Sequence, residues 1–387
     1  MQKNSDIVFG KVESGEISIS FSGFAGEEIT EYNLIISPQE VSDFEAQVNT
    51  VKDGLRQFMD DRNISADAVF LRRFFISDAA NQCPLLEEMT KCDGPVSIVE
   101  QPPLNGCKVI LWAILLAGKN ITKETAGNHG IIRHNGYTHI LSTQMHSGEF
   151  QNESREQTDD IFCEYIHFLS KNQLTLKDNC LRTWLFVHDI DNNYRGMVNA
   201  RNRIFSENGL DKNSHFIAST GIEGRHPVAA VKVLMDAYAV DGLRGEQIKF
   251  LSAPSHLNPT YEYGVAFERG TAIDYGDRRH IFISGTASIG SRGEILHNGD
   301  LTGQTARVFE NIRALLKQAG ADLNNVTCMI VYLRDIADYQ LINKYMQQHY
   351  LSIPHAIVLA PVCRPGWLVE VECVAVLRVK NHDFSNF

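Results

Sequence analysis

The sequence lacks the short motifs that mark several common classes of protein. Its eight cysteines include no Cys-x-x-Cys pair, so we interpret them as buried free thiols rather than as metal ligands or a redox pair. The metalloprotease motif His-Glu-x-x-His, the hydrolase motif Gly-x-Ser-x-Gly and the dinucleotide fingerprint are also missing. We therefore expect neither a metal nor an organic cofactor.

Positive charge and long apolar runs are scarce as well. The formal net charge is −11 and no cluster of Lys and Arg offsets it, which argues against a nucleic-acid partner. The longest apolar run, residues 109–117, is too short to cross a membrane, and the first residues lack the apolar stretch of a signal peptide. The expected location is the cytoplasm. A length of 387 residues with 43% hydrophobic and 21% charged residues is typical of a folded protein with two or three domains.

One pattern of predicted elements occurs three times along the chain. Each copy reads β-β-α-β-α-β-β, and the strand before the second helix ends at Asp78, Asp189 or Asp335. Ser37 and Ser154 each open a predicted capping box before the first helix of their copy. The repeat predicts a module at residues 1–120, a second at 121–240 and a C-terminal one at 241–387.

The repeat also predicts how the modules pack. A mixed sheet with two helices on one face is an α+β layer whose other face must be buried. Three such layers can bury those faces against one another around a pseudo-threefold axis. We therefore predict a single-chain pseudo-trimer with a barrel core and clefts between neighbouring modules. The sequence leaves the oligomeric state of the whole chain open.

The last strand of the third copy carries the main functional clue. Residues 369–376 read Val-Glu-Val-Glu-Cys-Val-Ala-Val and align without a gap with residues 107–114 and 231–238. In this alignment Lys108 and Lys232 stand where the third copy has Glu370. A carboxylate in an apolar strand either gains cationic partners or keeps its proton, and either state suits acid–base chemistry. The alternative is that Glu370 faces solvent on an edge strand or pairs with a lysine.

Three features of the third copy occur together in one known family. They are the segment Phe-Ile-Ser-Gly-Thr-Ala-Ser at residues 282–288, the predicted helix over 304–319, and Arg364-Pro before the strand that carries Glu370. The last third of the chain thereby resembles the RidA/YjgF family of small trimeric imine deaminases, which implies an active site between modules. The chain departs from that family at Pro354-His355-Ala356, where the family has a catalytic arginine, and at Phe267, where it has a tyrosine.

Four motifs spread over the last two copies extend the resemblance. They are Thr-Gly-Ile-Glu-Gly-Arg at 220–225, Phe-Glu-Arg-Gly at 267–270, Gly-Thr-Ala-Ser-Ile at 285–289, and Cys363-Arg-Pro with Glu370 seven residues further on. The whole chain resembles the chorismatases, which are enlarged single-chain relatives of the RidA fold. The resemblance implies that Glu370 is the general acid. It also implies that the residue at position 363 separates subtypes: a small residue accompanies hydrolysis to a dihydroxycyclohexadiene carboxylate, and cysteine accompanies hydroxybenzoate formation.

Chorismate carries two carboxylates and an enolpyruvyl ether, so release of pyruvate needs an acid together with cationic groups. Arg225, Arg269 and Arg364 lie in or beside the shared motifs and are the candidates for binding the carboxylates. Any one of them alone is more often part of a surface or inter-module salt bridge. We expect about two of the three to face the cleft.

Two strand ends and one cysteine complete the predicted site. Thr220-Gly221 and Gly285-Thr286 could present backbone N–H groups to a carboxylate, and a plain tight turn is the alternative. Cys363 could be a nucleophile, a proton shuttle or a filler; without a neighbouring histidine its thiolate has no evident activator, so we favour a role in shaping the intermediate.

The leading hypothesis is therefore chorismate cleavage to pyruvate and a hydroxybenzoate or dihydroxycyclohexadiene carboxylate. One alternative is a RidA-like deaminase that acts on an imine or enamine. A different class is a catalytically silent module that binds a small carboxylate or a partner protein.

Overall fold

Three six-stranded sheets of one topology form the core. The computed structural model describes residues 6–91 and 94–387. The strand orders are β1-β2-β3-β6-β4-β5, then β7-β8-β9-β12-β10-β11, then β13-β14-β15-β18-β16-β17. In each sheet the third strand along the chain pairs with the last one: β3 with β6, β9 with β12, and β15 with β18. The strands β5, β11 and β17 lie at one edge of their sheets. This repeated order confirms the predicted α+β fold of three modules, whereas closure into one barrel stays a prediction.

The first module begins with a meander of three strands. Its elements are β1 (Ile7–Ser14), β2 (Ile17–Ala25), β3 (Ile29–Pro38), α1 (Phe44–Asp60), β4 (Val69–Ile76), α2 (Ala79–Thr90), β5 (Ser97–Glu100) and β6 (Val109–Gly118). The capping box predicted at Ser37 is wrong, because β3 continues to Pro38 in its ladder with β2. Asp43 caps α1 instead, its carboxylate accepting the N–H of Ala46 at 2.8 Å.

The second module repeats this order with longer helices. Its elements are β7 (Thr122–Ala126), β8 (His129–His134), β9 (Tyr137–His146), α3 (Ser154–Lys171), α4 (Leu176–Asn179), β10 (Cys180–Val187), α5 (Ile190–Glu207), β11 (Ala218–Glu223) and β12 (Val233–Asp241). Ser154 is already the first residue of α3, and its hydroxyl donates to the carbonyl of Asn193 at 2.8 Å. The second predicted capping box is therefore wrong too.

The third module repeats the same order of strands and helices. They are β13 (Ile248–Leu251), β14 (Gly270–Asp274), β15 (Arg278–Ala287), α6 (Leu301–Gln318), β16 (Val326–Leu333), α7 (Tyr339–His349), β17 (His355–Leu359) and β18 (Val369–Arg378). Short 3-10 turns complete the chain at Ala66–Ala68, Gly245–Gln247, Thr260–Tyr263, Leu323–Asn325 and Ile336–Asp338. The three sheets lie within residues 7–118, 122–241 and 248–378; the module boundaries stay a prediction.

The same hydrogen bond ties the first helix of each module to its last strand. In every case a glutamine side chain accepts the backbone N–H of the residue just before that strand. The pairs are Gln47 with Lys108 at 2.7 Å, Gln157 with Lys232 at 2.8 Å, and Gln304 with Leu368 at 2.9 Å. Lys108, Lys232 and Leu368 are therefore structurally equivalent.

This equivalence corrects the gap-free alignment by two residues. The counterparts of Glu370 are Ile110 and Leu234, not the two lysines. Strand pairing agrees, because Ile76–Val109, Val187–Val233 and Leu333–Val369 are matching pairs. A shift of two residues keeps side chains on the same face of a strand, but Lys108 and Lys232 lie just before β6 and β12, at the position of Leu368 rather than of Glu370. The third module still carries the only carboxylate of the three equivalent positions.

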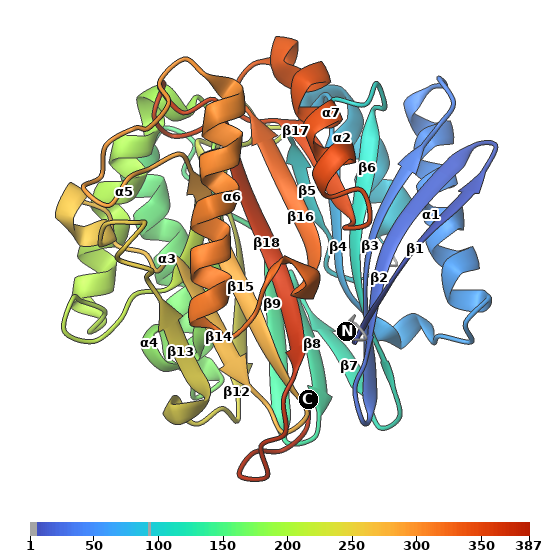
Figure 1. The fold of residues 1–387 in the computed structure, drawn as a ribbon, viewed down its shortest axis with the longest axis horizontal. Helices are drawn as coiled ribbons and strands as arrows, with labels where there is room; N and C mark the ends of the chain where they lie inside the picture. Colours follow the sequence, from blue (N-terminus) through green and yellow to red (C-terminus); the bar gives the residue numbers. More distant parts are fainter. Residues whose placement is uncertain (1–5, 92–93) are drawn as a thin grey trace.

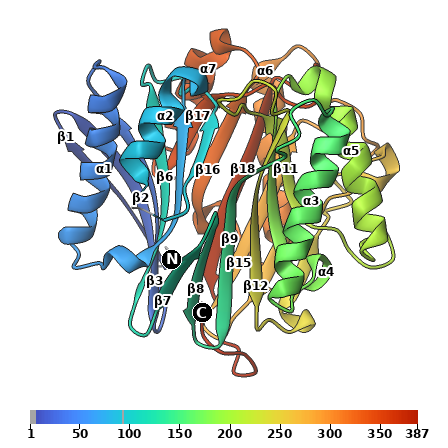
Figure 2. The same cartoon turned by 180° about the vertical axis from the view of Figure 1, so that it is seen from behind.

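The sheets face inward and the helices cover them from outside. Figures 1 and 2 show α1 and α2, α3 and α5, and α6 and α7 on the outer faces of their sheets. The inner faces share one hydrophobic cluster to which all modules contribute, for example through Trp112, Trp184 and Tyr332. Isolated β-bridges, such as Ile222–Val362, join neighbouring modules. The inner faces of the three sheets are therefore buried against one another, as the sequence predicted for sheet faces that no helix covers.

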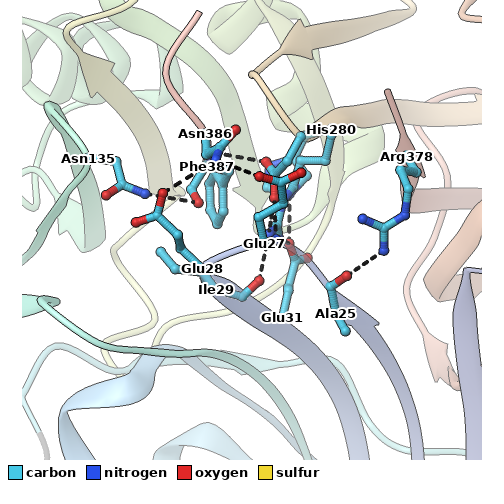
Figure 3. Close-up of polar contacts among 12 residues, drawn as sticks. Ala25, Glu27, Glu28, Ile29, Glu31, Asn135, His280, Arg378, Asn386 and Phe387 are labelled. Atoms are coloured by element: carbon cyan, nitrogen blue, oxygen red, sulfur yellow. Dashed lines mark hydrogen bonds and ion pairs between the residues drawn. The ribbon is translucent and has the colours of Figure 1, made fainter. Parts of the chain in front are cut away.

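The C-terminal residue ties the modules together at one end of the core (Figure 3). Phe387 is 2% exposed, and its N–H donates to Asp277 at 3.0 Å while Asn135 donates to its carbonyl oxygen at 3.3 Å. Its ring packs edge-on to His280, with 4.4 Å between ring centroids, and lies beside Arg278. The tail thus links the second and third modules, and Asn386 reaches two glutamates of the first.

Two further sequence expectations concern membranes and thiols. Among the described helices, none has both the length and the apolar character needed to cross a membrane. The seven described cysteines are free, and Cys163 is exposed rather than buried. Cys92 lies outside the described residues.

Candidate active site

A cleft of about 340 Å³ lies between the second and third modules. Helix α5 and strand β11 form one wall, strands β15 and β18 form another, and the loops around Tyr263 and Cys363 complete it. Figure 2 shows α5, β11 and β18 on the same side of the molecule. Six predicted site residues line the cleft: Gly221, Arg269, Gly285, Cys363, Arg364 and Glu370.

Glu370 is the acidic group of the cleft. It lies on the inner face of β18, is 5% exposed, and pairs in the sheet with Tyr332 and Ala287. No hydrogen bond or ion pair holds its carboxyl within the described residues. Burial first, and then the negative charge of Glu372, raise the pKa of Glu370 to about 8. The side chain is therefore mostly protonated near neutral pH.

Gly285 makes room for that carboxyl. A bulge in β15, between Ile283 and Thr286, brings the Gly285 backbone against the side chain of Glu370. A Cβ at position 285 would lie 2.1 Å from Oε1 of Glu370, which no real side chain tolerates. Glycine is needed here for close approach rather than for an unusual backbone angle.

Four arginines line the cleft: Arg195 is exposed, and three others, Arg201, Arg269 and Arg364, are partly or fully buried. Arg201 on α5 is 1% exposed, and its Nε and Nη2 atoms have no partner in the described part of the chain. Arg269 donates to the carbonyl of Asn258 at 3.2 Å, and Arg364 donates to that of Gly293 at 3.3 Å. No carboxylate within the described residues forms an ion pair with any of these three arginines. They can therefore bind the carboxylates of a ligand.

Aromatic rings complete the walls. The guanidinium groups of Arg269 and Arg364 lie 5.5 Å and 4.8 Å from the ring centre of Tyr263. Arg364 also lies 4.7 Å from the ring of Trp367. Flat apolar surfaces beside fixed cations suit a ligand with a six-membered ring and carboxylates.

Cys363 is held as a neutral thiol. Burial and the nearby Glu370 raise the pKa of its thiol to about 12. A thiol in that state is a poor nucleophile, which favours the pocket-shaping role over the nucleophilic one.

Three predicted residues lie outside the cleft. Arg225 is half exposed at the junction of the first and second modules, near Glu100 and Glu223. Thr286 donates to the carbonyl of Ser284 at 2.8 Å. Thr220 faces the interior, where its hydroxyl accepts the N–H of Gly285 at 2.9 Å. This N–H is thus already hydrogen-bonded to Thr220, and its binding of a substrate carboxylate stays a prediction.

The sequence did contain a signal for Arg201, which was missed. Its spacing from Met197, Val198, Ile204 and Phe205 places it on the buried face of α5. A permanently charged side chain on an apolar helix face marks a site where a ligand or partner charge is required. Within the described residues, no group of three or more His, Cys, Asp or Glu side chains is arranged to hold a metal ion.

Comparison with known proteins places these features in a family. A family model described as endoribonuclease L-PSP matches residues 271–377. A RutC family protein of Pyrococcus abyssi is 39% identical over 98 residues, which cover 24% of this chain and 76% of that protein. The 3-aminoacrylate deaminase RutC of Acinetobacter baylyi is 32% identical over 97 residues, covering 24% of this chain and 77% of that protein.

A solved structure extends the likeness to the whole fold. The crystal structure of a chorismatase superposes with a TM-score of 0.62 at 18% sequence identity, covering 80% of this chain and 93% of the chorismatase chain. At this identity the likeness shows the fold, which is the three-module architecture described above. The endoribonuclease L-PSP model covers residues 271–377, where Glu370, Cys363 and Arg364 lie. The chain thus belongs to the RutC family, in a three-module fold shared with chorismatase.

Proposed function

We propose that this protein cleaves chorismate to pyruvate and a hydroxybenzoate, with Glu370 as the general acid. The observation that carries the proposal is a buried carboxyl, protonated near neutral pH, in a cleft with three arginines that no carboxylate of the described chain neutralises. The chorismatase fold supports the substrate class, and a substrate with two carboxylates matches the surplus of positive charge.

The proposed reaction begins with proton transfer from Glu370 to the methylene carbon of the enolpyruvyl group. The C=C bond supplies the electron pair, and a cation forms at the ether carbon. Water adds to that carbon and returns one proton to the Glu370 carboxylate. The adduct then breaks the bond between this carbon and the ring oxygen, and its hydroxyl proton passes to that oxygen, which releases pyruvate. A positioned acid contributes typically ~10²–10⁴-fold to such a step. Loss of one water from the ring then gives a hydroxybenzoate, so the overall reaction consumes no net water.

The other cleft residues position the substrate. Arg201, Arg269 and Arg364 would hold the two carboxylates, and the rings of Tyr263 and Trp367 would enclose the cyclohexadiene. The neutral thiol of Cys363 would shape the pocket around the ring. The hydroxybenzoate product follows from cysteine at this position in the chorismatase resemblance. We place the enzyme in the cytoplasm on the sequence evidence.

The test is a coupled assay of pyruvate release from chorismate, with the aromatic product separated by chromatography. We expect Glu370→Gln to lose activity by about 10²–10⁴-fold because an amide cannot donate the proton. The matched control is Glu310→Gln, which removes a half-exposed carboxylate on the outer helix α6 and should leave the rate unchanged. No pyruvate from the wild-type protein would reject the proposal.

A second candidate is an imine or enamine deaminase. Membership of the RutC family favours it, and the relative from Acinetobacter baylyi is named 3-aminoacrylate deaminase. His355 stands in the segment where the RidA resemblance calls for a catalytic arginine, which weighs against it. Ammonia release from an enamine, without pyruvate release from chorismate, would support this candidate. If neither reaction occurs but chorismate raises the melting temperature, the module binds without catalysis.

A further inference from the structure

We propose that Glu372 is a positioning residue for Glu370: its fixed negative charge beside the acid keeps Glu370 in the proton-donating form. The inference deepens the proposed function and rests on it for the role of Glu370 as donor. The two glutamates are two residues apart on β18, so their side chains leave the same face of the strand. Their environments nevertheless differ completely.

Hydrogen-bond donors surround the Glu372 carboxylate. Nη2 of Arg182 donates to Oε2 at 2.6 Å, and the indole N–H of Trp184 donates to Oε1 at 3.0 Å. The hydroxyl of Thr220 also contacts Oε2. That hydroxyl accepts from the N–H of Gly285 at 2.9 Å and from Arg182, which occupies both of its lone pairs. Its single proton must therefore point at Glu372.

These three hydrogen bonds determine the charge of Glu372. Both of its oxygens accept hydrogen bonds, and among the described residues no hydrogen bond from Glu372 to an acceptor is present, so we assign Glu372 as the ionised partner. Glu370 receives no such hydrogen bond within the described residues. Of two carboxyls in one buried space, one is stabilised as the anion and the other carries the proton, because two adjacent negative charges are costly.

Thr220 and Gly285 bring the two carboxyls together. A Cβ built on Gly285 would lie 2.1 Å from Oε1 of Glu370 and 3.0 Å from Cγ2 of Thr220. The methyl group of Thr220 thus borders the Glu370 site while its hydroxyl binds Glu372. The ionised Glu372 is only 3% exposed, so solvent screens its charge weakly.

The remaining groups around Glu370 carry no second negative charge. The cations are Arg182 on β10, Arg195 and Arg201 on α5, and Arg269 and Arg364 on the loops; the weak acids are Tyr194, Tyr263, Tyr332 and Cys363. Burial raises the pKa values of these four weak acids, so they stay neutral near pH 7. Among the described groups around Glu370, Glu372 is therefore the anion that opposes ionisation of Glu370.

The test follows the protonated carboxyl of Glu370 directly. Infrared difference spectra between the full chain and its Glu370→Gln variant isolate the carboxyl band of Glu370, which is titrated with pH. We expect Glu372→Gln to lower the protonation constant of Glu370 by about tenfold or more, from a Coulomb interaction at an effective dielectric constant near 20. Glu372→Asp keeps the charge and should restore most of the wild-type titration. An unchanged titration in Glu372→Gln would overturn the proposal.

A second measurement covers the case in which Glu372→Gln does not fold, since it leaves Arg182 buried without its counterion. Carbon-13 NMR of glutamate carboxyls in the wild-type chain should show Glu372 ionised throughout the range in which Glu370 titrates. A protonated Glu372 at pH 7 would overturn the proposal. Neither spectroscopic measurement needs turnover, so the role of Glu372 is decided even if chorismate yields no pyruvate.

Discussion

The cleft between the second and third modules has a counterpart between the first and second. Both neighbouring sheets carry a bulge at the same place, so Gln144 on β9 corresponds to Gly285 on β15. Leu234 stands where the cleft has Glu370. Gln144 fills its position: its N–H donates to Asp236 at 2.9 Å, and its side chain accepts the N–H of Ile98 at 3.1 Å.

The inner carboxylate is shared by the two junctions. Asp236 corresponds to Glu372, and each is held by an arginine of the preceding module, Arg73 at 2.8 Å and Arg182 at 2.6 Å. The repeated architecture therefore supplies a buried ion pair at both junctions. The cleft adds an uncompensated carboxyl and a glycine that admits it. These two positions, rather than the fold, distinguish the candidate active site.

Replacing Glu370 by leucine, the residue type of its counterpart Leu234, should have the largest effect on activity. We expect Glu370→Leu to lower kcat/KM for pyruvate release from chorismate by about 10²–10⁴-fold, because leucine has no proton to donate. Steady-state kinetics would measure the loss. The reciprocal variant Leu234→Glu should not create activity at the filled junction. Near-wild-type activity in Glu370→Leu would show that the comparison has identified the wrong group.

The same exchange should change how stability depends on pH. The pKa of Glu370 is raised to about 8 in the folded protein, so its favourable contribution is complete below the ordinary value of 4.5 and is lost as pH rises towards 8. As pH rises from 4.5 to 8, the free energy of unfolding of Glu370→Leu should therefore increase by roughly 3–5 kcal/mol relative to that of the wild type. Urea unfolding at several pH values would measure this, and parallel profiles would contradict it.

Closing the space beside the acid should have a smaller effect on activity. In Gly285→Ala the new methyl group would displace the Glu370 carboxyl, and a misplacement of about 1 Å can lower the rate by about 10²-fold. Pyruvate release would measure the change. Gly245→Ala is the control, because a Cβ there meets no atom within 4 Å. Equal activities of the two variants would refute the role of Gly285.

Removing one cleft cation should give the smallest change. We expect Arg201→Gln to raise KM for chorismate by about 10–100-fold, since one charge-assisted hydrogen bond contributes about 1.5–3 kcal/mol. Arg225→Gln is the matched control, because Arg225 lies at the other junction near Glu100 and Glu223. A larger increase in KM for Arg225→Gln than for Arg201→Gln would show that the substrate binds at the junction of the first and second modules, which contradicts the account.

The sequence predicted the repeated elements better than the geometry between them. Local patterns sufficed for α6 (Leu301–Gln318), predicted over 304–319, and for β18 (Val369–Arg378), which contains the predicted strand residues 369–376. The counterparts of Glu370 were misplaced by two residues, because such a shift preserves the alternation of side chains and a gap-free match between apolar strands does not detect it. Thr220 shared a motif with Gly221, yet only Gly221 reaches the cleft, because neighbouring residues of a strand face opposite sides. Arg225 lies beyond the end of β11, near Glu100 and Glu223.

The central claim is that Glu370 donates a proton inside the cleft between modules. Its most direct test is the pH dependence of kcat/KM for pyruvate release from chorismate. The raised pKa of Glu370 predicts that activity persists through neutral pH and falls above about pH 8, as the acid loses its proton. A rate that already falls above pH 4.5, or one that stays constant beyond pH 9, would contradict the account.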